Sequence, residues 1–428
     1  MARILIIGGS LGGLFAANML LRDGHDVQVM ERTPGSLDGR GAGIVTHKAL
    51  DAALIRAGLT SCENLGVSVQ RRVVLAQDGS TQSSMNMPQV LTSWSRLYSL
   101  LKDLFPAERY QSATSFQSLR TEDNQVRATM RRGGDDFTET ADLLIACDGI
   151  RSSVRTQLMP HITSSYAGYI AWRGICDEAV LSKHTQNTLF NMFGFGVSAG
   201  EQILGYPVAG PGNATDVGKR CYNTVWYRTA DRTTTLVNLM TDASGTHYPQ
   251  GIAPDKVVSQ HVDAMRQDAW RLLAPQFAEV IEKTTQPFFQ PIHDLTSTEM
   301  AFERVALLGD AAFVARPHVG MGVTKAALDA SALTDSIRAY GPNEKALKHY
   351  AALRLPAGLT VVERARALGD HMQGHQNNPA RKFGAQADDA AWVLRHTAVD
   401  LGTGGVSLYA DVDQSSIPQS SQLHPMSH

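Results

Sequence analysis

A glycine-rich loop near the amino terminus constrains the fold of this chain more than any other feature. The loop Gly8-Gly9-Ser10-Leu11-Gly12-Gly13 lies between the apolar segment Ile4–Ile7 and the helical spacing of Leu11–Arg22. A second apolar segment, Asp26–Met30, follows. Glycines let the backbone turn sharply and approach a pyrophosphate, and a helix amino terminus attracts its negative charge. The sequence therefore predicts a βαβ unit that binds a dinucleotide through Gly8, Ser10, Leu11 and Gly13.

An acidic residue supports this prediction. Glu31 ends the second predicted strand, 18 residues after Gly13, where a carboxylate accepts hydrogen bonds from an adenosine ribose. Its neighbour Arg32 is a further predicted cofactor contact. Ser10 replaces the middle glycine of the GxGxxG pattern, and its small side chain is compatible with the turn. The alternative is an ordinary glycine turn, against which the strand, the helix and Glu31 argue together.

Two later segments carry a related pattern. Asp148-Gly149-Ile150-Arg151-Ser152-Ser153-Val154-Arg155 follows the apolar segment Leu143–Cys147. Gly309-Asp310-Ala311-Ala312, which continues to Gly320-Met321-Gly322, follows Val305–Leu308. An aspartate beyond a buried strand accepts hydrogen bonds from sugar hydroxyls, and a glycine loop that opens a helix presents N–H groups to negative charge. The three segments together predict one flavin dinucleotide held along most of its length.

The order of elements indicates an α/β fold with an inserted sheet. Short strands rich in aromatic and β-branched residues run from Tyr166 to about Leu239, and a helical stretch runs from Asp255 to about Glu282. We predict a FAD-binding Rossmann-like βαβ domain, an inserted mainly antiparallel β-sheet substrate domain, and C-terminal helices. The predicted boundaries are 1–75, 92–165 and 285–395 for the FAD-binding domain, 76–91 and 166–284 for the substrate-binding domain, and 396–428 for a flexible tail.

Composition excludes several classes of partner. The chain has 39 Lys and Arg against 41 Asp and Glu without a basic block, so neither nucleic acid nor an anionic membrane is expected. The four cysteines lack CxxC or metal-ligand spacing, which favours a reducing compartment and no bound metal. No stretch approaches the roughly 20 apolar residues that cross a bilayer. Because the first apolar run is too short for a signal peptide, we expect a cytoplasmic protein.

The three segments resemble the motifs of the single-component FAD-dependent aromatic hydroxylases, the fold group typified by para-hydroxybenzoate hydroxylase. The resemblance extends from residue 1 to about 370. It implies that the first loop and Glu31 bind the ADP half of FAD, that the second segment contacts FAD and the nicotinamide donor, and that the third binds the ribityl chain and flavin. The matching residues are Asp148, Gly149, Arg151, Ser152 and Arg155, then Gly309, Asp310, Ala311, Ala312, Pro317, Gly320, Met321 and Gly322. Arg40, in the loop after Glu31, is a candidate for the pyrophosphate or the flavin.

Further stretches resemble the dihydroxypyridine hydroxylases of that family. They are Arg316-Pro317-His318, Tyr166-Ala167-Gly168-Tyr169 leading to Trp172-Arg173-Gly174, and Phe105-Pro106-Ala107-Glu108-Arg109-Tyr110. They favour a hydroxylated N-heteroaromatic ring as substrate. The chain departs from the family at Phe313, Thr324 and Trp94, where many relatives have His, Asn and Arg. Arg96 is a candidate to replace that arginine, and the alternative is a solvated surface position.

The resemblance implies a flavin-dependent NAD(P)H aromatic-ring monooxygenase. In such an enzyme NADH or NADPH reduces FAD, O2 adds to form the flavin C4a-hydroperoxide, and one oxygen is transferred to an electron-rich ring carbon. The alternatives are a FAD-dependent epoxidase or Baeyer-Villiger monooxygenase, a non-catalytic FAD-binding sensor, and a plain NAD-dependent dehydrogenase. Members are often dimeric, so a homodimer is one expectation, and the sequence leaves the oligomeric state open.

Three residues are candidates for contact with the ring, where the chemistry needs a base or acceptor and the exclusion of water. His318 lies in the flavin loop, and an ordinary histidine pKa of about 6.5 permits proton exchange near neutral pH. Its alternative role is structural, in capping the loop. His47 follows the Gly41-Ala42-Gly43 turn, and the alternative is a solvent-facing position at a helix start. Tyr206 is a candidate to orient a ring hydroxyl, or else a buried tyrosine bonded to backbone.

Two further positions lie on predicted strands. Trp226 and Tyr227 alternate faces, so only one of them can face the pocket. Arg173 is assigned to the domain junction, with substrate contact as the alternative.

Overall fold

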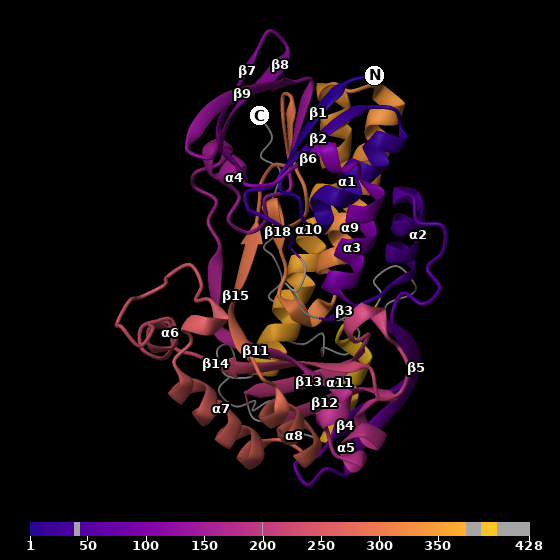
Figure 1. The fold of residues 1–428 in the computed structure, drawn as a ribbon, viewed down its shortest axis with the longest axis vertical. Helices are drawn as coiled ribbons and strands as arrows, with labels where there is room; N and C mark the ends of the chain where they lie inside the picture. Colours follow the sequence, from indigo (N-terminus) through magenta and orange to yellow (C-terminus); the bar gives the residue numbers. More distant parts are fainter. Residues whose placement is uncertain (38–42, 199, 374–386, 400–428) are drawn as a thin grey trace, which may run out of the picture.

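The computed structural model describes residues 1–37, 43–198, 200–373 and 387–399. Its upper part in Figure 1 is built on a six-stranded sheet of order β16-β17-β10-β1-β2-β6, parallel except for the β16–β17 pair. The strands are β1 Arg3–Ile7, β2 Asp26–Met30, β6 Tyr110–Gln111, β10 Leu143–Ala146, β16 Ala301–Phe302 and β17 Val305–Leu307. The predicted βαβ unit is confirmed.

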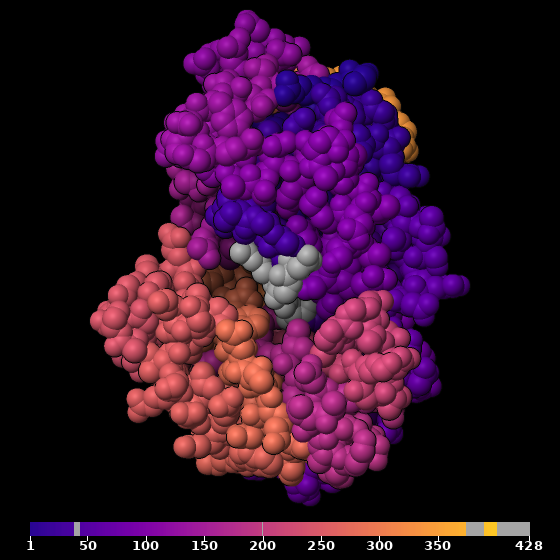
Figure 2. Space-filling model, in the orientation of Figure 1, coloured from indigo at the N-terminus to yellow at the C-terminus, as the bar shows by residue number. Residues whose placement is uncertain are grey.

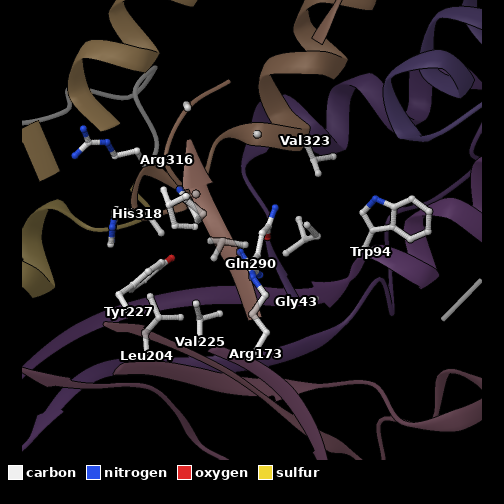
Figure 3. Close-up of a pocket in the computed structure, with 18 of the residues that line it drawn as sticks. Gly43, Trp94, Arg173, Leu204, Val225, Tyr227, Gln290, Arg316, His318 and Val323 are labelled. Atoms are coloured by element: carbon white, nitrogen blue, oxygen red, sulfur yellow. The ribbon is translucent and has the colours of Figure 1, made fainter. Parts of the chain in front are cut away.

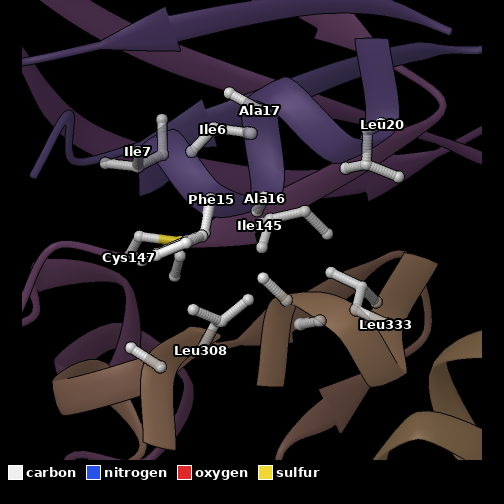
Figure 4. Close-up of a cluster of buried hydrophobic side chains, with 14 of the residues drawn as sticks. Ile6, Ile7, Phe15, Ala16, Ala17, Leu20, Ile145, Cys147, Leu308 and Leu333 are labelled. Atoms are coloured by element: carbon white, nitrogen blue, oxygen red, sulfur yellow. The ribbon is translucent and has the colours of Figure 1, made fainter. Parts of the chain in front are cut away.

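Apolar strands and helices form the core of this upper part. Helix α1 (Leu11–Arg22) follows β1 through the glycine loop, and α9 (Gly322–Tyr340) packs beside it. Figure 4 shows Phe15 and Leu20 of α1 between the strands and Leu333 of α9, and all three side chains are buried. The sheet thus presents the carboxyl ends of β1, β2 and β10 along one edge, where ligands of open α/β sheets bind.

The remaining elements of the upper part surround this core. The three-stranded antiparallel sheet β7-β8-β9 projects from the top in Figure 1. Its strands are Thr114–Glu122, Gln125–Arg132 and Asp135–Ala141, and the helices are α2 Lys48–Ala57, α3 Trp94–Leu104, α4 Ser153–Leu158 and α10 Glu344–Gln373.

A nine-stranded sheet of order β18-β15-β11-β14-β13-β12-β4-β5-β3 forms the lower part. Every pair is antiparallel except β12–β4, so the predicted mainly antiparallel sheet is confirmed. The strands are β3 Gly43–Val45, β4 Val67–Leu75, β5 Thr81–Ser93, β11 Ser165–Asp177, β12 Met192–Ser198, β13 Glu201–Val208, β14 Cys221–Thr229, β15 Phe288–Thr296 and β18 Phe313–Val314.

The two faces of this sheet have different neighbours. Trp172, Trp226 and Phe289 pack on the outer face against α7 (Ser259–Leu272) and α8 (Pro275–Lys283). The inner face carries Tyr206 and Tyr227 and is turned toward the upper part. The short helices α5 (Lys183–Leu189) and α6 (Thr235–Leu239) lie in the connections between strands. No helix among the described ranges is long and apolar enough to cross a membrane.

The sheet extends beyond the predicted limits of the substrate domain. Strand β4 pairs with β5 although the boundary was placed between 75 and 76, and β15 pairs with β11 although 285–395 was assigned to the FAD-binding domain. Alternating apolar residues at Val67–Leu75 do not reveal which sheet a strand joins, because pairing is a long-range property. The division into domains stays a prediction.

Two expectations about helices and the tail need correction. The helical stretch from Asp255 to Glu282 consists of a turn at Pro254–Lys256 and the helices α7 and α8. The break between α7 and α8 lies at Pro275. Proline has no backbone N–H to donate inside a helix, so it is favoured at the first position of a helix, where it begins α8. The predicted flexible tail from 396 begins too early, since Thr397 and Ala398 after α11 (Ala387–His396) are buried. The rest of that tail lies outside the described residues.

Candidate functional site

Two cavities meet at Trp94, which lines both of them. The first, of about 360 Å³, lies at the carboxyl ends of β1, β2 and β10. The second, of about 310 Å³, lies between the late glycine loop and the inner face of the nine-stranded sheet. Figure 2 shows the molecular surface hollowed between the upper and lower parts. The first cavity is lined by Gly8, Ser10, Glu31, Arg32, Asp148, Gly149 and Arg151, among others.

The first glycine loop has little room for side chains. Gly8 has a φ of +102°, and a Cβ on it would lie 2.4 Å from the Cys147 carbonyl oxygen. A Cβ on Gly13 would lie 1.9 Å from the Gly8 carbonyl oxygen. Gly8 and Ser10 line the cavity, whereas Gly13 and Leu11 are buried in α1. The latter two therefore support the packing of the loop, and the structure does not place them in the cavity wall.

Glu31 holds the loop from the neighbouring strand. One carboxylate oxygen accepts the Gly9 N–H at 2.9 Å, and the other accepts the Thr33 N–H at 2.8 Å. A carboxylate has about four acceptor positions, so hydrogen bonds to a ligand remain available. Arg32 lines the same cavity, and Arg40 lies outside the described residues.

Asp148 presents an unused acceptor at the base of the first cavity. Its Oδ2 accepts the N–H groups of Ser153 and Val154, whereas its buried Oδ1 has no hydrogen-bond partner in the described ranges. Burial raises the pKa of this carboxyl. Buried polar atoms are nearly always hydrogen-bonded in folded proteins, so a ligand donor such as a sugar hydroxyl is expected at Oδ1.

Arg155 ties the second segment to the third. Its guanidinium donates to the carbonyl oxygens of Ala311 at 2.8 Å and Ile150 at 2.6 Å. Ser152 caps α4 by accepting the Arg155 N–H. These two residues are structural connections beside the cavities, and the structure does not place them in a cavity wall.

The third segment forms one wall of the second cavity. Asp310, Pro317, Gly320 and Gly322 line it, and Met321 is buried outside the lining. Gly320 has a φ of +65°, and a Cβ there would lie 2.6 Å from the Ala398 side chain. Gly322 begins α9, so N–H groups of a 19-residue helix are directed to this wall.

His318 lines the second cavity as a buried, neutral histidine. Its Nε2 is 2.9 Å from the Tyr169 hydroxyl, and its ring centroid is 4.0 Å from that of Tyr227. Burial, with the charges of Arg316 and Arg173, lowers the pKa of His318 to about 3. The expectation of proton exchange near neutral pH is therefore wrong, because sequence alone does not show the burial of the imidazole.

His47 lies elsewhere. It is buried at the start of α2, with Nδ1 3.0 Å from the Thr324 hydroxyl oxygen, and it does not line either cavity. This placement corrects both the predicted ring contact and the solvent-facing alternative. The departure from the family at Thr324 was noticed in the sequence, but nothing in the sequence pairs it with His47. Arg96 also lies outside both linings.

The inner sheet face supplies the opposite wall of the second cavity. Tyr206, Tyr227 and Arg173 line it, whereas Trp226 lies on the outer face, so the predicted alternation of Trp226 and Tyr227 is confirmed. Burial raises the pKa of Tyr227 to about 12, so its hydroxyl is neutral. Figure 3 shows the Tyr227 hydroxyl and the Arg173 guanidinium directed into the cavity.

Strand β15 is the part of the wall that the sequence did not reveal. Phe288, Gln290 and Ile292 line the second cavity from this strand, and Phe289 faces outward. The pairing of β15 with β11, which brings these residues to the cavity, was not predicted.

The residues present fit a flavin dinucleotide. A glycine loop, Glu31 and the unpartnered Asp148 oxygen form one end of the site, and the late glycine loop and a helix amino terminus form the other. The shared lining at Trp94 makes the two ends one site of elongated shape. Such a site suits a long ligand with a phosphate-bearing middle.

Comparisons with known proteins agree with this geometry. The family model described as FAD binding domain-like matches residues 166–294. The chain is 29% identical over 400 residues to the 2,6-dihydroxypyridine 3-monooxygenase of Paenarthrobacter nicotinovorans, covering 92% of this chain and 98% of that protein.

Solved structures have the same fold. The 2,6-dihydroxypyridine-3-hydroxylase of Arthrobacter nicotinovorans superposes with a TM-score of 0.81 at 28% identity, covering 90% of this chain and 95% of the other. Klebsiella pneumoniae HpxO complexed with FAD and uric acid superposes with a TM-score of 0.70 at 22% identity, covering 87% and 89%, which shows likeness of fold alone. The chain is therefore similar along nearly its whole length to the single-component FAD-dependent aromatic hydroxylases, and the resemblance that its motifs indicated is confirmed.

Proposed function

We propose that this chain is a FAD-dependent monooxygenase that uses NADH or NADPH and O2 to hydroxylate a small hydroxylated aromatic or pyridine-type ring. The observation that carries the proposal is the second cavity, which has the late glycine loop on one side and Tyr206, Tyr227 and Arg173 on the other. The 2,6-dihydroxypyridine 3-monooxygenase to which the chain is similar supports a ring of this class.

All three segments are assigned to the cofactor. Glu31 and the Asp148 Oδ1 would accept hydrogen bonds from sugar hydroxyls of the ADP half, and the loop ending at Gly322 would hold the flavin half. A bound FAD supplies the hydride acceptor and the oxygen-activating centre of the reaction. The amino terminus of α9 favours negative charge at this wall, which is the charge that a reduced flavin carries.

The sheet wall is assigned to the substrate. Phe193, Leu204 and Val225 make much of the lining apolar, and an apolar lining excludes water from the reacting ring. The neutral Tyr227 hydroxyl donates a hydrogen bond to a ring oxygen. The Tyr169 hydroxyl is hydrogen-bonded to Nε2 of His318, and Nδ1 of that ring has no hydrogen bond to described residues. His318 therefore acts at Nδ1 as a neutral hydrogen-bonding group.

The test is a substrate screen with the FAD-loaded protein. Hydroxypyridines, hydroxybenzoates and related rings are added singly, and oxidation of NADH or NADPH is followed by absorbance. We expect one class of ring to stimulate oxidation, with one atom of labelled O2 in a hydroxylated product by mass spectrometry. The Tyr227→Phe variant keeps the ring and removes the hydroxyl, so we expect weaker turnover with intact FAD content.

Other outcomes would support other functions. Label inserted into a ring C–C bond indicates Baeyer-Villiger chemistry, and label in an oxirane indicates an epoxidase. Oxidation that no ring stimulates would contradict the proposal and favour a FAD-binding sensor. A homodimer and cytoplasmic residence stay predictions from the family resemblance and composition.

A further inference from the structure

We propose that Arg173 binds an anionic oxygen of the ring substrate and so selects rings that carry an ionised hydroxyl or a carboxylate. The inference deepens the proposed function and rests on it, because it names the charge of the substrate at the same cavity. It starts from one feature of the wall, an arginine side chain without an acidic partner among the described residues.

The sheet register fixes the direction of Arg173. On β11 it is opposite Val225 of β14 and Phe288 of β15, and both of these residues line the second cavity. Side chains directly opposite each other in antiparallel strands share a face. The preceding residue, Trp172, is on the other face, in the core under α7 and α8. Arg173 therefore extends from the middle of the cavity floor, as Figure 3 shows.

Two other arginines near the sheet are paired with carboxylates, whereas the buried Arg72 of β4 donates to carbonyl oxygens. Arg316, which lines the same cavity, donates to Asp294 through Nε and Nη2 and to Asp370 through Nη1 at 2.8 Å. Arg220, on another part of the sheet, is paired with the buried Glu178 at 2.7 Å. These pairs show how this fold compensates a guanidinium that is removed from water.

Arg173 has no such compensation in the described ranges. It makes no ion pair or hydrogen bond there, and its buried Nε is without an acceptor. The acidic residue of the same lining, Asp310, is already 3.8 Å from Lys325 Nζ. A guanidinium in a mostly apolar cavity is costly unless an acceptor pairs with it. Because no described residue supplies that acceptor, we assign it to the ligand that fills the cavity.

The charge of Arg173 affects the pKa of three neighbouring groups. Tyr206, Tyr227 and His318 line the cavity, and burial has the largest effect on the pKa of each. The charge of Arg173 lowers the pKa of both tyrosines and, after that of Arg316, of His318. A ring hydroxyl in the same space would experience the same field and would lose its proton more readily. Since an ionised hydroxyl makes a ring more electron-rich, the contact would favour both binding and attack by electrophilic oxygen.

The test compares three ligands that share one ring. They are 3-hydroxypyridine, pyridine-3-carboxylate and 3-methylpyridine, which offer an ionisable hydroxyl, a carboxylate and a neutral group. Dissociation constants are measured for the FAD-loaded protein from changes in the flavin absorbance spectrum, at several pH values across the ionisation of the hydroxyl. The variants are Arg173→Met, Arg173→Lys and the matched control Val225→Ala, which changes the same floor without changing its charge.

We expect the wild type to bind at least one anion more tightly than 3-methylpyridine. Arg173→Met should raise the dissociation constant of that anion about 10- to 100-fold, the range of a charge-assisted hydrogen bond. The dissociation constant of 3-methylpyridine should change by no more than about 3-fold. Arg173→Lys should keep part of the preference, and Val225→Ala should affect all three ligands alike. A hydroxyl preference that grows as the pH rises identifies ring hydroxyl substrates, and a carboxylate preference identifies ring acids.

Two results would overturn the inference. One is that the wild type binds neither anion more tightly than 3-methylpyridine. The other is that Arg173→Met weakens the binding of all three ligands equally, which would indicate that Arg173 only shapes the cavity. If Arg173→Met fails to retain FAD, the ratio of anion to neutral affinity in Arg173→Lys decides. Because these are binding ratios, they remain informative even if no ring is hydroxylated.

Discussion

The imidazole of His318, in the late glycine loop, packs against the rings of Tyr169 and Tyr227 of the lower sheet. Tyr169 fixes the orientation of the imidazole through Nε2. Burial lowers its pKa to about 3, so the ring is uncharged throughout the neutral range. A neutral imidazole can donate or accept a hydrogen bond without bringing a second charge near Arg173.

This burial has a consequence for stability against pH. The pKa of His318 is about 3 when folded and about 6.5 when unfolded, so between these values the unfolded chain binds a proton that the folded chain does not. The free energy of unfolding should fall as the pH is lowered from about 6.5 toward 3, by up to about 1.4 kcal/mol per pH unit.

The His318→Asn variant should lack this part of the slope. Urea unfolding of both proteins at pH 7.5, 6.5, 5.5 and 5.0 measures it, with the exposed His161→Asn as the control expected to follow the wild type. Equal slopes for His318→Asn and the wild type would show that His318 titrates normally.

Among the elements, the end of helix α11 meets the late glycine loop, and Ala398 just beyond it lines the second cavity. Arg72 on β4 is fully buried and donates to the carbonyl oxygens of Leu394 at 3.1 Å, Thr397, and Ala398 at 2.7 Å. The Ala398 N–H donates to the His318 carbonyl oxygen at 2.9 Å. One side chain thus holds the end of α11 against the loop that is assigned to the flavin.

Removal of this side chain should loosen α11 and the glycine loop together. Arg72→Met leaves several buried carbonyl oxygens without donors, and we expect a loss of about 2–4 kcal/mol in the free energy of unfolding. Hydrogen exchange should accelerate at Val393–Ala398 and at Gly320. Arg71→Met, at the neighbouring exposed position, is the control. Unchanged exchange at Gly320 would show that α11 does not support the loop.

The sequence predicted elements well where local chemistry determines them. The strand, glycine loop and helix at 4–22 were predictable because Gly8 and Gly13 have no room for a Cβ. Other features join residues that are distant in sequence. They are the contact of His47 with Thr324, the hydrogen bond of Arg72 to Ala398 beyond α11, and the position of β15 in the cavity wall. Such contacts depend on packing of the whole chain, which periodicity does not encode.

For the molecule as a whole, the elongated site lies between the carboxyl ends of the upper strands and the inner face of the lower sheet (Figure 1). The first cavity is formed at the upper sheet, and the second lies over the lower sheet. Arg155 joins the second and third segments by its two carbonyl contacts. A ligand that occupies both ends should therefore stabilise both halves.

Thermal unfolding should reveal this double contact. FAD should raise the melting temperature progressively with concentration, by mass action worth about 2.7 kcal/mol at 100 times its dissociation constant. ADP and FMN, which can occupy one end each, should together raise it less than FAD at equal concentration, because linkage makes the second contact intramolecular. If ADP alone reproduced the effect of FAD, the late glycine loop would not be a cofactor contact.

Strand β15 runs from the floor of the second cavity, where it pairs with β11, to Leu295 and Thr296, which pair with β18 beside the late glycine loop. If the chain is divided into two complementing fragments, that strand should therefore be left intact. A cut within it would part the groups that orient the ring from those that orient the flavin. The hairpin tip at Asp123-Asn124, at the opposite end of β7 from the lining residues Thr114–Phe116, is the more promising place to split or insert.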